Sequence, residues 1–342
     1  MSSQGIADFR SDTVTRPSAA MYEAMQKAPL GDDVFGDDPT VLELEVFAAS
    51  LFGKKSALFV PSGTMANQIA ARLHTDRDSE ALVEASAHCL VWEQAGFAQL
   101  SGIQIKTIAG RRGMMALKDL EAATRGDNEH WPRTKLLCLE NTHNGAGGAV
   151  LPLEYLRSCR EFADSKGMKV HLDGARLVNA EAATGIALDK WAATADSVSC
   201  CLSKGLGAPV GSLLLGDESF VKEARRVRKL FGGGMRQAGI LAAAGLVALR
   251  DMRARLVDDH RRAASLAEAF GRLPGIEVVA PETNMLYFSL AGRAKELQDG
   301  FEKMGVLTLA LNEDSLRLVC HLDIDDEHVE RAISALETLV KN

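Results

Sequence analysis

The segment VSCCLSKGLG at residues 198–207 is an apolar run that ends at one lysine and is followed by two glycines. The run predicts a buried strand. Lys204 at its end extends its ammonium group into solvent, pairs the charge, or uses a neutral amine as a nucleophile. The segment alone does not separate a structural lysine from a reactive one, so the rest of the sequence has to decide.

Further short apolar runs alternate with helix-like segments over residues 56–216. This alternation is typical of an α/β fold with a mostly parallel, doubly wound sheet. The runs are ALFV (57–60), EALVE (80–84), IQIKTI (103–108), KLLCLE (135–140), KVHL (169–172), DSVSCCL (196–202) and GSLLLG (211–216).

The C-terminal part of the sequence changes in pattern. A helical pattern covers residues 239–273, which exceeds an ordinary globular helix, so we expect one long helix that connects two domains. Strand-like runs at 276–280, 285–290, 307–311 and 316–322 then alternate with helix-like segments. We expect a large domain over residues 1–250, including the N-terminal segment, and a small α+β domain over residues 251–342.

Charge and composition exclude several classes of protein. The chain has 39 Lys and Arg against 46 Asp and Glu, a net charge of −7, which argues against a nucleic-acid or anionic-membrane binder. The first residues lack a leader pattern and no apolar segment is long enough to cross a bilayer, so we expect a cytoplasmic protein. The six cysteines lack C-x-x-C spacing and are interpreted as core residues, so no metal site is expected.

Polar residues directly follow several of the apolar runs, where ligands of open parallel sheets bind. Pro61-Ser62-Gly63-Thr64 follows the first run and precedes a helix-like segment. Such a turn presents backbone N–H groups at a helix N-terminus and favours a phosphate, although a plain serine N-cap explains it equally well. It lacks the glycine-lysine pair of a nucleotide P-loop.

Two histidines occupy comparable positions. His88 follows the run at 80–84 and could stack on a flat heteroaromatic ring or transfer protons, although a structural role is the alternative. His143 follows the run at 135–140, within an Asn-Thr-His-Asn-Gly sequence. Turn chemistry explains the Asn-Gly pair but does not require the histidine.

Asp173 and Arg176 follow the run at 169–172. A carboxylate at a strand end can hold a protonated pyridine nitrogen, and an arginine can bind a substrate carboxylate through its fork. An internal Asp–Arg pair is the alternative. A phosphate site, a stacking histidine, a carboxylate and the amine of Lys204 at one sheet edge together predict a site for pyridoxal phosphate.

Longer motifs are similar to those of the threonine aldolases, which belong to the fold type I pyridoxal-phosphate enzymes. The resemblance extends from residue 9 to residue 323 and so covers almost the whole chain. It rests on FRSDTVTRPSAAM (9–21), GDDVFGDDPT (31–40), PSGTMAN (61–67), LENTHN (139–144), HLDGARL (171–177), SKGLGAPVGSLLLG (203–216), FGGGMRQAGILAAAG (231–245) and RLVCHLD (317–323).

The resemblance implies roles for individual residues. Lys204 would bind the cofactor covalently, Asp173 would keep the ring nitrogen protonated, and His88 would stack on the ring. Further cofactor contacts are implied for Gly63, Thr64 and Arg176 and, from a neighbouring subunit, for Lys229 and Arg236. Substrate contacts are implied for Ser11, Arg176, Arg317 and Trp92. A site completed by a neighbouring subunit implies an oligomer, expected to be a homotetramer built as a dimer of dimers.

The implied reaction is retro-aldol cleavage of L-threonine, L-allo-threonine and related β-hydroxy-α-amino acids to glycine and an aldehyde. His88 and His143 are both candidates to take the hydroxyl proton. A pyridoxal-phosphate-dependent β-eliminating lyase or racemase is the alternative, because the same cofactor supports several bond cleavages at Cα. A nicotinamide dehydrogenase is disfavoured, since no G-x-G-x-x-G follows a predicted strand.

Overall fold

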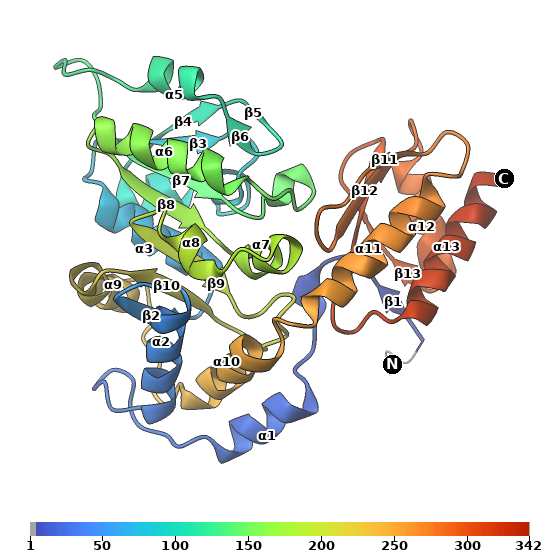
Figure 1. The fold of residues 1–342 in the computed structure, drawn as a ribbon, viewed down its shortest axis with the longest axis horizontal. Coiled ribbons are helices and arrows are strands. Elements are labelled where there is room, and N and C mark those ends of the chain that lie inside the picture. The colour runs from blue at the N-terminus through green and yellow to red at the C-terminus, as the bar shows by residue number, and fades with distance from the viewer. Residues whose placement is uncertain (1–4, 342) are drawn as a thin grey trace.

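The computed structural model describes residues 5–341, and its larger part is built around one seven-stranded sheet (Figure 1). In spatial order, the strands are β2 (Ser56–Val60), β10 (Ser212–Gly216), β9 (Ser197–Cys201), β8 (Lys169–Asp173), β7 (Thr134–Glu140), β3 (Glu80–Glu84) and β4 (Gln104–Ile108). β10 is antiparallel to both of its neighbours, and the other adjacent pairs are parallel. The expected mostly parallel, doubly wound sheet is confirmed.

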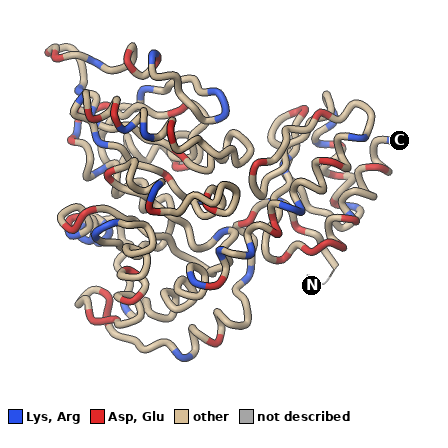
Figure 2. Tube along the Cα trace, in the orientation of Figure 1, with Lys and Arg blue, Asp and Glu red and all other residues tan. Residues whose placement is uncertain are grey.

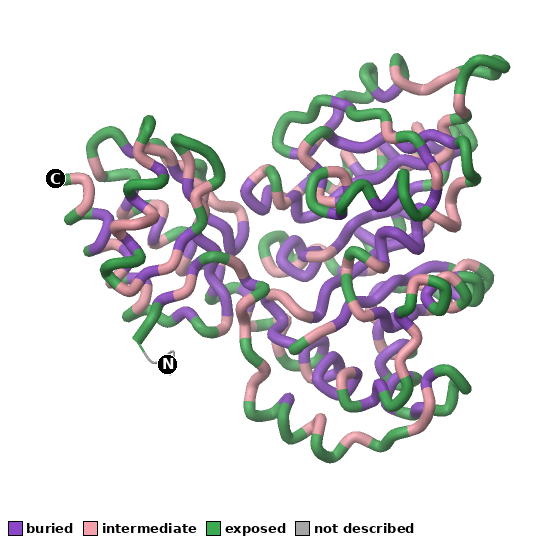
Figure 3. The backbone as a smooth tube through the Cα atoms, turned by 180° about the vertical axis from the view of Figure 1, so that it is seen from behind, coloured by how far each residue is buried: buried purple, intermediate pink, exposed green. Residues whose placement is uncertain are grey.

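Helices cover both faces of this sheet, so its central strands are buried along their length (Figure 3). Burial on both faces explains why the strands read as unbroken apolar runs rather than as alternating patterns. The helices are α3 (Gly63–His74), α4 (His88–Val91), α5 (Leu117–Ala123), α6 (Leu153–Ser165), α7 (Leu177–Thr184), α8 (Leu188–Ala192) and α9 (Glu218–Leu230). α3 packs across β8, β9 and β10.

The expected single helix over residues 239–273 is wrong. The segment forms α10 (Gly239–Asp251) and α11 (Leu256–Phe270), with a break at residues 252–255. At the break, Nε of Arg253 donates to the carbonyl of Leu249, the acceptor that the backbone N–H of residue 253 would use in a continuous helix. Arg253 also forms an ion pair of 2.6 Å with Glu181, which holds its side chain in this position.

The two helices pack in different parts of the molecule. α10 packs against α1 (Ala19–Lys27) and α2 (Pro39–Leu51), whereas α11 packs against α13 (Asp326–Lys341) and β12 (Met285–Ser289). The connection between the parts therefore runs through the break (Figure 1). The division of domains after residue 250 stays a prediction.

The C-terminal part contains a four-stranded antiparallel sheet. In spatial order it consists of β11 (Glu277–Val279), β12, β15 (Ser315–Val319) and β14 (Leu309–Ala310), and α12 (Ala294–Lys303) packs with it. The run at 307–311 was expected to be one strand. It is divided between β13 (Val306–Leu307) and β14, which pair with different partners.

The N-terminal segment lies with the C-terminal sheet rather than with the large one. β1 (Ala7–Asp8) pairs in parallel with β13. Phe9 is fully buried in the same apolar cluster as Phe270 and Phe288. Phe9 therefore packs with residues of the C-terminal part. The expected division, which placed residues 1–250 in the large domain, did not include this long-range contact.

Short elements complete the described chain, and the charges are spread over it. These elements are η1 (Asp12–Val14), β5 (Gly110–Arg111), β6 (Met114–Met115), η2 (Phe97–Ser101) and η3 (Asn144–Ala146). Acidic and basic residues are interspersed along the trace in Figure 2. The six cysteines are buried and free, as expected. Across residues 5–341, no helix combines the length and apolar character needed to span a bilayer.

Candidate functional site

Strand register brings the predicted site residues to one edge of the large sheet. Glu140 pairs with Asp173, and Asp173 pairs with Ser199, so the carboxyl ends of β7, β8 and β9 are level. β10 pairs Ser212 with both Cys201 and Val60, which places the carboxyl end of β2 at the same edge. Asp173 is the last residue of β8, and the segments that follow the other strands carry Gly63, Thr64, His143 and Lys204.

Asp173 is a buried carboxylate with three hydrogen-bond donors. Oδ2 accepts from Nδ2 of Asn67 at 2.7 Å, and Oδ1 accepts from the backbone N–H of Ala175 at 3.0 Å and from Oγ of Ser199 at 3.3 Å. Burial alone would raise the pKa of Asp173, but the positive charges of His88 and Lys204 and these donors outweigh it and lower the pKa. Asp173 is therefore an anion held in one orientation, which suits a protonated ring nitrogen.

His88 is the first residue of α4, and its ring is partly exposed. Nδ1 lies 2.9 Å from Oε1 of Glu93, whose side chain is fully buried. Burial would lower the pKa of His88, but Glu93 and Asp173 outweigh it and raise the pKa. Glu93 also accepts hydrogen bonds from Asn67 at 2.8 Å and Gln68 at 2.7 Å. Sequence reasoning missed Glu93, although its position five residues after His88 in the same segment was a usable signal.

His88, Glu93 and Asp173 offer ligand atoms within 4.8 Å of one another, a spacing that could hold a metal ion. However, the amide of Asn67 donates to both carboxylates. A cation between the carboxylates would have to displace this donor, whereas a cationic ring nitrogen at Asp173 would not. The arrangement therefore fits an organic cation better than a metal.

The turn before α3 is shaped for close approach of an anion. Oγ of Ser62 caps α3 by accepting from the N–H of Met65 at 3.2 Å, so the alternative N-cap role is real. The first N–H groups of a helix have no acceptor within that helix, and those of Gly63 and Thr64 are among them. A Cβ at Gly63 would lie 2.7 Å from Sγ of Cys201, so only glycine allows this turn to pack against β9.

Arg176 forms a different ion pair from the one that the sequence suggested. Its Nε and Nη2 bind both oxygens of Asp12, at 2.8 and 2.5 Å. Burial would raise the pKa of Asp12, but Arg176 outweighs it and lowers the pKa. The fork of Arg176 is thus occupied by Asp12, and only Nη1, at 3.3 Å from Oδ1 of Asn144, faces another group. Asp12 was missed, although it lies within the quoted motif at 9–21.

Arg317 lies on β15 and reaches the same amide as Arg176. Its Nη1 lies 3.5 Å from Oδ1 of Asn144, and its Nη2 donates to the carbonyl of Arg10 at 2.9 Å. Within residues 5–341, the buried Nε of Arg317 has no hydrogen-bond acceptor. Two guanidinium groups that are 141 residues apart thus converge, and one keeps an unused buried donor, an arrangement that favours a bound carboxylate.

His143 is buried beneath the strand ends. Nε2 lies 3.1 Å from Oε2 of Glu84, and the side chain is fully buried. Burial would lower the pKa of His143, but Glu84 and Glu140 outweigh it and raise the pKa. A Cβ at Gly113 would lie 2.6 Å from the ring, so the surrounding loop packs directly on His143.

The remaining predicted residues lie at the surface or beside Asp12. Oγ of Ser11 accepts from the N–H of Thr13 at 3.2 Å and is 3.5 Å from Asp12. Trp92 follows α4 and is 63% exposed. Arg236 forms an ion pair of 3.0 Å with Asp32, and Lys229 is exposed in the last turn of α9. The contacts of these residues with cofactor and substrate stay a prediction.

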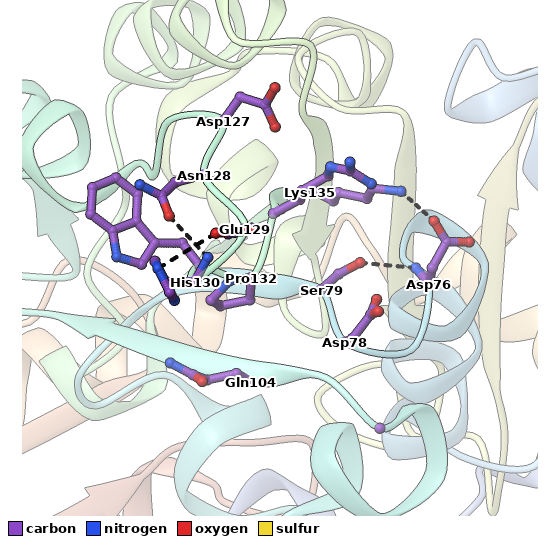
Figure 4. A pocket seen from close by; sticks show the side chains of 13 residues that line it. Asp76, Asp78, Ser79, Gln104, Asp127, Asn128, Glu129, His130, Pro132 and Lys135 are labelled. Atoms are coloured by element: carbon purple, nitrogen blue, oxygen red, sulfur yellow. Dashed lines mark hydrogen bonds and ion pairs between the residues drawn. The ribbon is translucent and has the colours of Figure 1, made fainter.

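A cavity of about 1100 Å³ lies at the opposite edge of the sheet (Figure 4). Its lining comes from the segments that precede β3, β4 and β7, and includes Asp76, Asp78 and His130. The five-residue strand β3 spans about 17 Å, so this cavity is separated from the carboxyl ends by the length of the strands.

The model of the family described as Beta-eliminating lyase matches residues 8–292. The chain belongs to this family. It is 47% identical over 324 residues to a low specificity L-threonine aldolase from Escherichia coli (strain K12), covering 94% of this chain and 96% of that protein. It is 44% identical to low-specificity L-threonine aldolase 1 from Arabidopsis thaliana, covering 96% of this lyase and 95% of the relative.

The fold of this lyase also matches solved structures. A structure of a threonine aldolase from Leishmania major superposes with a TM-score of 0.84 at 20% identity, covering 98% of this chain and 99% of that one. At this identity the likeness concerns the fold, and it agrees with the fold type I architecture expected from the motifs.

Proposed function

We propose that this lyase uses pyridoxal phosphate to cleave L-threonine, L-allo-threonine and related β-hydroxy-α-amino acids into glycine and an aldehyde. The observation that carries the proposal is the buried anion Asp173, which lies at the same sheet edge as Lys204 and whose pKa Lys204 helps to lower. An amine and an ionised carboxylate at one strand edge provide an attachment point and a ring-nitrogen partner.

The residues present fit the cofactor. Lys204 would hold it through the side-chain amine, Asp173 would face its ring nitrogen, and His88 would lie against the ring. The N–H groups of Gly63 and Thr64 would bind the phosphate. When bound, pyridoxal phosphate supplies an electron sink for the charge left at Cα when the Cα–Cβ bond breaks.

The substrate carboxylate is assigned to Arg317, with help from Ser11 and Nη1 of Arg176. The unused buried donor of Arg317 supports this assignment. Because Arg176 already forms a bidentate ion pair with Asp12, we assign it a single contact with the substrate carboxylate rather than a bidentate one. Asn144, which lies between the two guanidinium groups, would be displaced or would share them with the substrate.

His88 is the better candidate for the base that takes the β-hydroxyl proton, directly or through water. Its side chain is 29% exposed, whereas His143 is fully buried against Glu84. A base must be within hydrogen-bond reach of the proton it removes, and a buried, ion-paired imidazole meets this condition less well. We assign His143 a structural role behind the site.

A homotetramer built from dimers remains our proposal for the assembly. Phe35 is 80% exposed and Leu230 is 70% exposed. Leu230 directly follows Lys229, and Asp32, three residues before Phe35, forms an ion pair with Arg236. Large apolar side chains of this exposure favour a subunit contact. In such a contact, Lys229 and Arg236 would reach a neighbouring phosphate site and Trp92 a substrate side chain. The cytoplasmic location also stays a prediction.

β-Elimination is the second candidate, because the matched family takes its description from that reaction. Product analysis separates the candidates. Purified protein loaded with pyridoxal phosphate is given L-threonine and L-allo-threonine separately. Equal amounts of glycine and acetaldehyde would support cleavage, ammonia with 2-ketobutyrate would indicate elimination, and an inverted α-carbon would indicate a racemase. No product from either isomer would contradict the proposal.

A further inference from the structure

Asn67 lies on α3 between two carboxylates of the site. It is buried, and its Nδ2 donates to Oδ2 of Asp173 at 2.7 Å and to Oε1 of Glu93 at 2.8 Å. Both partners are acceptors only, so the NH2 group of Asn67 must face them. Because Glu93 holds Nδ1 of His88 at 2.9 Å, one amide contacts both the ring-nitrogen partner and the residue that orients the stacking imidazole.

The other side of the amide is also engaged. Oδ1 of Asn67 lies 3.0 Å from Nε2 of His171 and 3.0 Å from Oγ of Ser199. If the amide were reversed, its oxygen would face two carboxylates and its NH2 group would face the imidazole. With the NH2 group facing the carboxylates, Oδ1 of Asn67 is an acceptor, and a proton on Nε2 of His171 would reinforce this orientation.

His171 is buried on β8, and its other nitrogen continues the chain of contacts. Nδ1 lies 2.8 Å from Oγ of Ser197, which lies 2.7 Å from Nε2 of His74. Burial lowers the pKa of His171 to about 4 and the pKa of His74 to about 3, so both are neutral at neutral pH. A neutral His171 has one ring proton, and Oδ1 of Asn67, which can only accept, receives a hydrogen bond from His171 when that proton is on Nε2.

The contacts thus form a directed series from the far end of α3 to the site. With the proton of His171 on Nε2, Ser197 donates to His171 and accepts from His74, and His171 donates to Asn67. Asn67 donates to the two carboxylates. No proton has to move for the series to act. The series acts by holding each side chain in one orientation, because each group donates to one neighbour and accepts from the other.

We propose that Asn67, held in one orientation by His171, is a positioning residue that fixes Asp173 and, through Glu93, His88 against the cofactor ring. The inference rests on the proposed function, because it assigns these residues to a pyridoxal-phosphate site. It adds that the position of the ring proton of His171, inside the sheet, controls how Asp173 and Glu93 are held at the edge of the sheet.

The test uses the full chain with two substitutions at His171. His171→Leu removes the donor, whereas His171→Gln keeps an N–H group at similar reach. We expect His171→Leu to weaken pyridoxal-phosphate binding by about ten-fold, as is typical when an outer partner of a ligand-binding residue is lost, and His171→Gln to restore most of it. Binding is measured by titrating apoprotein with pyridoxal phosphate and following the absorbance of the bound cofactor.

His260 provides a matched control. Its Nε2 lies 2.9 Å from Oδ1 of Asn179, and burial lowers its pKa to about 4, so it forms the same kind of buried His–Asn contact. We expect His260→Leu to leave cofactor affinity unchanged. Equal affinity in His171→Leu and His260→Leu would overturn the inference, while threonine cleavage by the wild type would still uphold the proposed function.

A second measurement observes the wild type and does not depend on the cofactor. Nitrogen-15 NMR of histidine-labelled wild-type apoprotein reports which ring nitrogen of His171 carries the proton, with His171→Gln used to assign the signal. A proton on Nε2 supports the inference. A proton on Nδ1, or a charged ring at neutral pH, would overturn it even if the wild type failed to bind pyridoxal phosphate.

Discussion

The two edges of the large sheet differ in what they offer a ligand. The amino edge has the cavity of about 1100 Å³, but its lining includes exposed groups such as the Asp76–Lys135 ion pair. The carboxyl edge has buried charges that meet at Asp173, whose pKa is lowered by His88 and Lys204 despite burial. Buried, convergent charge therefore identifies the reactive site better than empty volume does, because desolvating charges is costly unless they are used or paired.

The largest effect is expected for Lys204 at the carboxyl edge. Lys204→Ala removes the amine that would hold the cofactor, so threonine cleavage should fall by more than about 10³-fold, as for loss of a covalent catalyst. Glycine formation measures the activity, and circular dichroism checks the fold. Turnover close to that of the wild type would remove Lys204 from the mechanism.

Asp173→Asn should have the next largest effect. The variant keeps the size of the side chain but loses the charge that matches a protonated ring nitrogen, so we expect kcat to fall by about 10²-fold or more. Single-turnover kinetics with L-threonine would measure the loss. An unchanged kcat would mean that the ring nitrogen does not need a charged partner here.

Asp12→Asn tests a buried ion pair of the carboxyl edge through stability. Arg176 would lose its charged partner inside the protein, and breaking such a pair costs about 3 kcal/mol. The free energy of unfolding in urea at pH 7 measures this loss. A stability equal to that of the wild type would show that the pair contributes nothing.

The same pair predicts a pH dependence with a definite sign. The pKa of Asp12 is lower in the folded state than in the unfolded chain. Its contribution to stability is therefore fully present above an unfolded value of about 3.9 and is lost as pH falls below it toward the folded pKa. The stability difference between wild type and Asp12→Asn should shrink over that acidic range, and a constant difference would contradict the assignment.

The sequence predicted the carboxyl edge well and its inner contacts poorly. The run at 196–202 became β9 at Ser197–Cys201 because a strand buried on both faces has to be continuously apolar. The pairs Asp12–Arg176 and Asn67–Asp173 join residues 164 and 106 positions apart, and no local pattern encodes such contacts. The helix break at residues 252–255 was not predicted either. It depends on the contacts of the Arg253 side chain with Leu249 and Glu181, which no local pattern encodes.

A smaller effect is expected on the pH profile of cleavage. The pKa of His88 is raised, with Glu93 as the main cause that raises it, so kcat/KM should rise with pH through a midpoint above the usual histidine value of about 6.5. Glu93→Gln removes that negative charge and should move the midpoint to lower pH. Glu80→Gln is the matched control, because Glu80 is a buried carboxylate at the amino edge. An unmoved midpoint in Glu93→Gln would point to another base, with His143 and Glu84→Gln next to be tested.

The smallest effect is expected at the amino edge, where Asp76→Asn and Lys135→Ala remove one exposed ion pair beside the cavity. Exposed ion pairs are screened by solvent and contribute little, so both variants should unfold at the wild-type urea midpoint. Cleavage of L-threonine should stay within about two-fold of the wild type, because neither group contacts the carboxyl edge. A ten-fold loss in either variant, with the fold intact, would show that the cavity takes part in the reaction. Cavity volume would then indicate a functional surface that convergent buried charge does not.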